Sequence, residues 1–155
     1  VYENDAVRQY AEYVDLDTLF RESDFISLHC PLTEQTKYLI NDYSISKMKD
    51  GVMIINTGRG QLIHTNALIE GLKNKKIGSA GLDVYEEESE YFYEDQSDKI
   101  IDDDTLARLL SFNNVIVTSH QAFLTREALA NIASTTLQNI KDFMNHKPLE
   151  NEVRA

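Results

Sequence analysis

The chain has 155 residues, enough for one domain with a sizeable core but not for two. Hydrophobic residues make up 42%, which argues against a disordered chain, and the longest apolar runs are far too short to span a bilayer. With 15 basic against 26 acidic residues the net charge is −11, so the surface should repel nucleic acid and anionic membranes, and neither is expected as a partner.

Cysteine content and the first residues bear on the compartment. A single cysteine, Cys30, rules out an internal disulfide and is typical of a reducing cytoplasm. No secretory signal is expected, because residues 1–10 are polar and charged without an apolar stretch. No spacing of His, Cys and carboxylate residues matches a metal site, so no metal is predicted.

Apolar periodicity and capping residues predict alternating helices and strands along one continuous unit of 1–155. Strands are expected at 25–28, 52–55, 77–84 and 115–118. Helices are expected at 16–22, at 42–48, after a cap at Thr65, from Asp104 and at 125–145. Strands separated by helices imply right-handed crossovers, and their nearly continuous apolar character is typical of sheets covered on both faces. The predicted fold is α/β, a partial Rossmann-like doubly wound parallel sheet.

In open parallel sheets, ligands bind beyond the carboxyl ends of the strands. The first strand leads into His29, Cys30 and Pro31, and the second into a turn that contains Arg59. The third leads into Asp83 and an acidic loop, and the fourth into His120. An arginine, carboxylates and histidines should therefore meet at one edge, where they could form an acid–base site with an anion-binding cation.

Each of these residues also has an ordinary structural explanation. Arg59 could be a turn residue, although the glycines on either side indicate that the backbone passes close to another group, such as a ligand. Glu88 is one of many acidic residues in 86–104, most of which should form a solvated loop. His120 follows a buried strand, where a structural histidine is equally expected. His29 stands in a similar place, so position alone does not rank the two.

Three ordered motifs resemble those of the D-2-hydroxyacid dehydrogenases. They are Asn-Thr-Gly-Arg-Gly at 56–60, Gly-Leu-Asp-Val-Tyr-Glu-Glu-Glu at 81–88 and Thr-Ser-His-Gln-Ala-Phe at 118–123. Their order and spacing match the family along nearly the whole chain. The segments 26–33 and 48–51 are similar to the same family.

The resemblance implies a catalytic set of Arg59, Glu88 and His120. Arg59 would bind the carboxylate and carbonyl oxygen of a 2-keto acid through paired, charge-assisted hydrogen bonds. His120 would exchange a proton with the substrate oxygen while hydride moves to or from NAD. Glu88, five residues beyond Asp83, would hydrogen-bond His120 and favour its protonated form.

The resemblance also implies how the remaining strand-end residues meet cofactor and substrate. Asp83 would contact the nicotinamide side of NAD, and Phe123 would lie near the substrate beside Arg59 and His120. The other positions that match the cofactor lining are Cys30, Pro31, Thr36, Thr57 and Gly58, next to Arg59.

Within the family, the D-lactate branch fits best. It carries Tyr-Glu after the Asp-Val, a long insertion before the last strand, and His-Gln-Ala-Phe at the histidine, as at 120–123 here. The implied activity is NAD-dependent interconversion of D-lactate and pyruvate, by a homodimer. Two alternatives stay open: a dehydrogenase for another 2-keto acid, such as the D-hydroxyisocaproate type, and a non-catalytic NAD(H)-sensing binding module.

The family's Gly-x-Gly-x-x-Gly phosphate loop is absent, since Ile63 occupies the last glycine position after Gly58-Arg59-Gly60. The acidic residue that would bind the adenine ribose and the substrate domain are missing too. The chain is therefore expected to be the C-terminal part of a longer enzyme, inactive alone, with NAD against NADP undecided and one long sheet edge exposed. Many relatives have a capping Asp where His64 stands, and Thr65 should replace it; His64 and His146 are expected at the surface.

Overall fold

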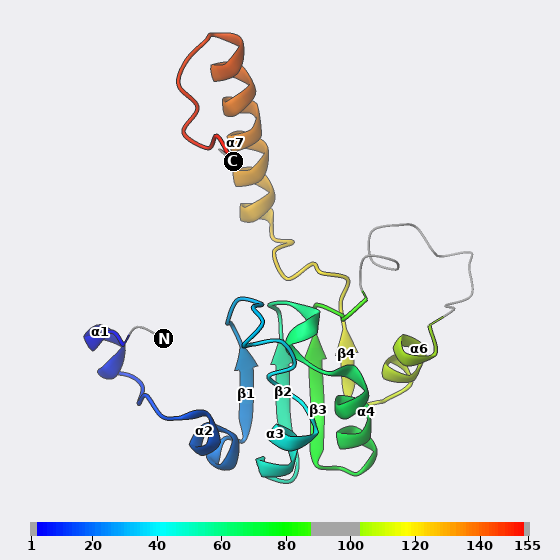
Figure 1. Ribbon diagram of the computed structural model, residues 1–155. Helices are drawn as coiled ribbons and strands as arrows, with labels where there is room; N and C mark the ends of the chain where they lie inside the picture. Colours follow the sequence, from blue (N-terminus) through cyan, green and yellow to red (C-terminus); the bar gives the residue numbers. More distant parts are fainter. Residues whose placement is uncertain (1–2, 88–102, 154–155) are drawn as a thin grey trace. The chain divides into compact units, whose positions relative to one another are not determined.

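The computed structural model describes residues 3–87 and 103–153 and divides into two compact units, Val1–His120 and Gln121–Ala155 (Figure 1). The first unit holds a four-stranded sheet in the order β1-β2-β3-β4, with every neighbouring pair parallel. Its strands are β1 (Phe25–Leu28), β2 (Val52–Asn56), β3 (Ile77–Leu82) and β4 (Val115–Val117). The predicted parallel α/β sheet is confirmed, with the third strand ending two residues earlier than expected.

Four of the α-helices described in the first unit begin directly after a residue whose side chain caps them. The helical segments of this unit are α1 (Asp5–Arg8), α2 (Leu16–Glu22), α3 (Asp42–Lys47), the 3₁₀ turn η1 (Gly60–Leu62), α4 (Thr65–Lys73) and α6 (Asp104–Leu110). Asp15 caps α2 and Asn41 caps α3. Neither α1 nor η1 was expected, because both are single short turns.

The expectation that Thr65 caps its helix is wrong. His64 occupies the N-cap position of α4 and makes no side-chain capping hydrogen bond, and Thr65 is the first helical residue. His64 is also half-buried rather than on the surface, with its ring 5.1 Å from that of Tyr38 in an edge-on contact. The open end of α4 is closed by a residue from elsewhere in the chain, described below.

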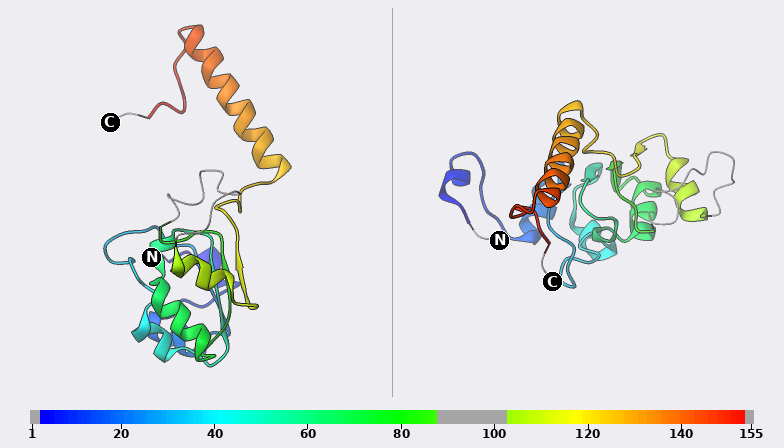
Figure 2. Two further views of the ribbon diagram at one scale, coloured as in Figure 1. Left: turned by 90° about the vertical axis from the view of Figure 1, so that its right-hand side faces the viewer. Right: turned by 90° about the horizontal axis from the view of Figure 1, so that it is seen from above.

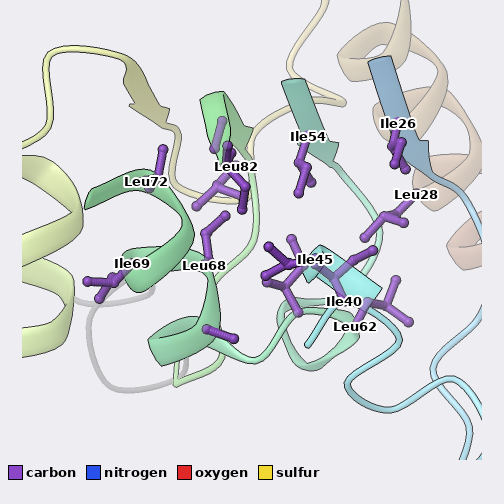
Figure 3. Close-up of a cluster of buried hydrophobic side chains, with 14 of the residues drawn as sticks. Ile26, Leu28, Ile40, Ile45, Ile54, Leu62, Leu68, Ile69, Leu72 and Leu82 are labelled. Carbon is purple, nitrogen blue, oxygen red and sulfur yellow. The ribbon is translucent and has the colours of Figure 1, made fainter. Parts of the chain in front are cut away.

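One face of the sheet carries the hydrophobic core, with α3 and α4 lying against it (Figures 1 and 2). Figure 3 shows apolar side chains from the strands and from these helices filling the space between the two layers. The fully buried members include Ile40, Ile54, Leu62, Leu68, Ile77 and Leu109. Burying each such side chain stabilises the fold by about 1.5–3 kcal/mol.

Side chains on the opposite face alternate with the core residues along the strands. Phe25 is 68% exposed and Ile116 is 70% exposed, while Met53 and Ile55 are half-buried. This face is therefore apolar but partly exposed in the described residues, and the coverage of both faces that the strand composition indicated stays a prediction.

The two glycines of β3 differ in how closely other atoms approach them. At Gly78 a Cβ would lie 2.4 Å from the carbonyl oxygen of Gly51, so only glycine fits. At Gly81 the nearest atom would be 4.0 Å away, and no such approach exists.

The second unit consists of α7 (Arg126–Met144) and the residues around it. Thr125 caps the helix by accepting a hydrogen bond from the amide of Ala128, which confirms the predicted start. None of its described residues is buried, and its large apolar side chains, which include Leu129, Ile132, Leu137 and Ile140, are exposed. In the described part of the chain, no helix is long and apolar enough to cross a membrane.

Candidate active site

The register of the sheet aligns the four strand ends in one row. Leu28 pairs with Asn56, Asn56 with Leu82, and Leu82 with Val117. Because all four strands point the same way, the segments that follow these residues leave the sheet at the same edge. The turn with Arg59, the residue Asp83 and the segment with His120 therefore belong to one edge, as the sequence predicted.

The buried amide side chain of Asn56 holds the turn that carries Arg59. Its Oδ1 accepts a hydrogen bond from the amide of Gly58 at 3.0 Å, and its Nδ2 donates to the carbonyl oxygen of Arg59 at 2.9 Å. Asn56 is only 1% exposed, so these bonds satisfy polar atoms that have no access to water. Sequence reasoning assigned Asn56 no role, although a polar residue directly after the apolar run at 52–55 was a signal.

The Arg59 side chain is exposed at this turn and donates from Nη1 to the carbonyl oxygen of Gly58 at 2.8 Å. Within 3–87 and 103–153, none of the ion pairs includes Arg59. An exposed guanidinium that has no ion pair among the described residues can bind an anionic group in the paired geometry that carboxylates favour.

An open pocket of about 500 Å³ lies between the β1 loop and the Arg59 turn. It is lined by His29, Cys30, Pro31, Leu32, Gly58 and Arg59. The structure thus brings together four of the residues predicted to line the cofactor or bind substrate: Cys30, Pro31, Gly58 and Arg59.

Thr36 does not line this pocket, and its predicted contact with the cofactor stays a prediction. Its hydroxyl donates to the carbonyl oxygen of Pro31 at 2.7 Å and accepts from the amide of Thr33 at 2.8 Å, which fixes the loop after β1. His29 lies within hydrogen-bond distance of Ser27, with 2.8 Å between Nε2 and Oγ.

Asp83 and His120 meet at the ends of β3 and β4. The amide of His120 donates to the carbonyl oxygen of Asp83 at 2.7 Å, and the hydroxyl of Thr118 donates to the Asp83 carboxylate. Asp83 is buried at 4% exposure, whereas His120 is half-buried. His120 has a φ of 52°, a left-handed conformation that is rare outside glycine. Thr118 is a second residue that sequence reasoning missed.

Besides Thr36, three predicted site residues are not placed at the pocket or at the contact between Asp83 and His120. Thr57 is exposed and does not line the pocket. Glu88 lies outside the described residues, and Phe123 belongs to the second unit. Their roles remain predictions from the resemblance.

The close approach expected at the glycines around Arg59 has a cause inside the protein. A Cβ on Gly60 would lie 2.0 Å from the carbonyl oxygen of Tyr85, so the turn packs directly on the backbone that follows β3. A ligand is not needed to explain this glycine. At Gly58 a Cβ would meet Leu62 at 3.3 Å, a tight contact again within the protein.

The residues of this edge fit one end of a nicotinamide cofactor. The pocket offers an apolar wall at Cys30, Pro31 and Leu32, and a polar side at Gly58 and Arg59. A flat ring with an amide substituent requires such a mixture. Among the described residues, no group of three or more His, Cys, Asp or Glu side chains could hold a metal ion.

The fold and this site define a Rossmann-like α/β domain with its ligand edge at the carboxyl ends of the strands. The chain belongs to the D-isomer specific 2-hydroxyacid dehydrogenases, whose NAD binding domain model matches residues 1–122.

Individual relatives agree with this family. The chain is 55% identical over 142 residues to a D-lactate dehydrogenase of Escherichia coli, which covers 92% of this chain and 43% of that protein. It is 49% identical over 143 residues to an aromatic 2-oxoacid reductase of Clostridium sporogenes, again covering 92% and 43%. The solved D-lactate dehydrogenase with NAD+ from Lactobacillus jensenii superposes with a TM-score of 0.87 at 35% identity, covering 100% of this chain and 47% of that one. The chain thus spans less than half the length of these relatives.

Proposed function

We propose that this chain is the cofactor-binding part of an NAD-dependent D-2-hydroxyacid dehydrogenase that interconverts pyruvate and D-lactate. The observation that carries the proposal is Arg59, a cation without an ion pair among the described residues, at a pocket on the carboxyl edge of the sheet. The chain has a net charge of −11, so an anion needs a local positive charge to bind. Arg59 supplies that charge for the carboxylate of a 2-keto acid.

Each residue has a separate task in the proposed reaction. When bound, NADH supplies the hydride that reduces the keto carbon. Arg59 binds the carboxylate and carbonyl oxygen of the substrate and so orients that carbon. His120 gives a proton to the carbonyl oxygen, which becomes the hydroxyl of the product, and regains it from solvent.

Two carboxylates complete the proposed site. Glu88, which lies outside the described residues, hydrogen-bonds the imidazole of His120 and favours its protonated form. Asp83 contacts the nicotinamide side of the cofactor; its burial and its bond from Thr118 support a fixed orientation. The proposed whole protein is a cytoplasmic homodimer, and the isolated chain, without a glycine-rich loop, is inactive.

The test measures NADH oxidation with pyruvate by the full-length protein. His120→Gln should lower kcat by about 10²–10⁴-fold, the usual contribution of a general acid. Glu88→Gln should lose less, and His29→Gln far less than His120→Gln. An unchanged rate in the His120 variant would reject its role, and NADH binding without turnover of any 2-keto acid would favour the sensing module instead.

A second substrate class has support from one comparison, the 49% identity to an aromatic 2-oxoacid reductase. Pyruvate, 2-ketoisocaproate and phenylpyruvate should therefore be assayed side by side. A kcat/KM highest for pyruvate supports the D-lactate assignment, and a preference for either larger acid replaces it while leaving the roles of Arg59 and His120 intact.

A further inference from the structure

The carboxylate of Glu86 connects the segments that follow three strands. Its Oε1 accepts a hydrogen bond from the hydroxyl of Tyr38, which lies beyond β1. Its Oε2 accepts from Thr65, at 2.8 Å from the hydroxyl and 3.3 Å from the amide, and Thr65 lies beyond β2. Glu86 itself follows β3. One side chain thus holds three strand-end segments to each other.

The bonds to Thr65 also explain how α4 begins without a capping side chain of its own. The N-cap residue His64 makes no side-chain hydrogen bond, so the first amides of the helix lack a local acceptor. The Glu86 carboxylate supplies that acceptor from the loop after β3 and places a negative charge where the helix dipole favours it.

The contacts around Glu86 are direct and nearly without free space. Gly60 packs on the carbonyl group of Tyr85. The amide of Tyr38 donates to the carbonyl oxygen of Gln61 at 2.8 Å, and the amide of His64 donates to the carbonyl oxygen of Ile40 at 2.9 Å. The cavity between Gly60, Thr65, Glu86 and their neighbours is only about 10 Å³, room for at most one water. A shift of any one segment must therefore move the others.

These segments carry proposed site residues directly. Arg59 immediately precedes Gly60, and Asp83 lies three residues before Glu86. Both oxygens of Glu86 already accept hydrogen bonds from Tyr38 and Thr65, which leaves the group poorly suited to exchange protons with a substrate. The bond to Glu86 also raises the pKa of the Tyr38 phenol, so Tyr38 remains a donor to Glu86 into the alkaline range.

We infer that Glu86 is a positioning residue for the proposed reaction, which fixes the Arg59 turn relative to the segment that begins with Asp83. The inference rests on the proposed function, because it assumes that these two residues meet one substrate–cofactor pair. Glu86 was passed over at the level of sequence, since nothing in an acidic run distinguishes a residue that points into the protein.

The experiment compares Glu86→Ala, Glu86→Gln and Tyr38→Phe in the full-length protein, with Glu87→Ala as the matched control. Glu87 is the exposed neighbour and has the same charge. Glu86→Gln keeps an acceptor for Thr65, and its amide can donate to the Tyr38 oxygen, so it should stay within about threefold of wild type. Glu86→Ala should lower kcat/KM for pyruvate about 10–100-fold, mainly through KM, because small misplacements of binding groups are that costly. Tyr38→Phe removes one bond and tests the same network should the alanine variant fold poorly.

A purely structural role predicts a different result. It would lower the melting temperature of Glu86→Ala and Tyr38→Phe but leave KM and kcat of the folded protein unchanged, and this outcome overturns the inference. Failure of the glutamine variant to restore KM would do the same.

Hydrogen exchange separates this inference from the proposed function. In Glu86→Ala and Tyr38→Phe, peptides covering 57–64 should exchange faster, while peptides from the sheet and the Glu87→Ala control should not change. If wild type reduces no 2-keto acid but this local change occurs, the proposed function fails and the coupling of the two segments stands. If exchange in 57–64 is unchanged, the inference fails whatever the activity.

Discussion

The amide of His120 lies 2.7 Å from the carbonyl oxygen of Asp83, and this hydrogen bond joins the chain beyond β4 to the chain beyond β3. The Thr118 hydroxyl, two residues before His120, adds a bond to the Asp83 carboxylate. Two proposed site residues from separate strands are therefore tied together before any ligand binds. Such preorganisation is what proton transfer and cofactor positioning require of a site.

Thr118→Val should show how much the hydrogen bond to Asp83 contributes to stability. Valine keeps the shape of threonine but removes the donor, so the buried carboxylate loses one hydrogen bond and the free energy of unfolding should fall by about 1–3 kcal/mol. Urea denaturation of the full-length protein measures the change. Thr118→Ser retains the hydroxyl and should lose clearly less; equal losses in the two variants would show that the methyl group matters and the bond does not.

Gly60→Ala should be strongly destabilising, because its Cβ would lie 2.0 Å from the backbone oxygen of Tyr85 and neither backbone can move without shifting the Arg59 turn. We expect a loss near the upper end of overpacking costs, about 3 kcal/mol. Gly81→Ala is the control, since its nearest neighbour would be 4.0 Å away. Thermal unfolding of both variants checks the contrast, and similar melting temperatures would contradict it.

Arg59→Lys should raise the KM for pyruvate even though the positive charge is kept. Lysine replaces a planar fork by a single point charge and cannot make the paired bonds, which are worth about 1.5–3 kcal/mol each when a charged group takes part. We expect about a tenfold rise in KM for lysine and more for Arg59→Gln. Arg21→Gln removes the same charge from α2 and is the control; an equal effect there would indicate general electrostatics rather than a specific contact.

Tyr85 should ionise only at strongly alkaline pH. Burial raises the pKa of its phenol most, and the hydrogen bond that its hydroxyl donates to Asp103 at 2.7 Å raises it further. Because the pKa in the folded protein exceeds the unfolded value of about 10, the stability from this group is present below pH 10 and lost as pH rises through the folded value.

Ultraviolet absorbance of tyrosinate measures this ionisation. At about pH 11 the folded wild type and Tyr85→Phe should show the same tyrosinate signal, because a phenol with an unfolded pKa of about 10 stays protonated when burial holds its pKa higher. In urea at the same pH the variant should lack the signal of one tyrosine. A signal already lower in the folded variant would show that Tyr85 ionises freely.

Much of the fold followed from local sequence, because apolar periodicity and capping residues act over a few neighbouring positions. The strands from Phe25, Val52, Ile77 and Val115 begin where predicted, and the capping of α7 by Thr125 needs only residues close in the chain. Thr65 was misplaced as a cap for the opposite reason: its acceptor, Glu86, is 21 residues away. No local pattern carries that contact.

For the site, the sequence by itself determined the family and the residue types at the ends of the strands, because ordered motifs at fixed spacing can be recognised without coordinates. Only the tertiary structure decided what those residues contact. Gly60 packs against the backbone of Tyr85, and the hydroxyl of Thr36 bonds to the carbonyl oxygen of Pro31. The hydrogen bond from Tyr38 distinguishes Glu86 from its acidic neighbours. The physical reason is that contacts between segments depend on how the crossovers pack, and a side chain's environment is fixed only when distant segments meet.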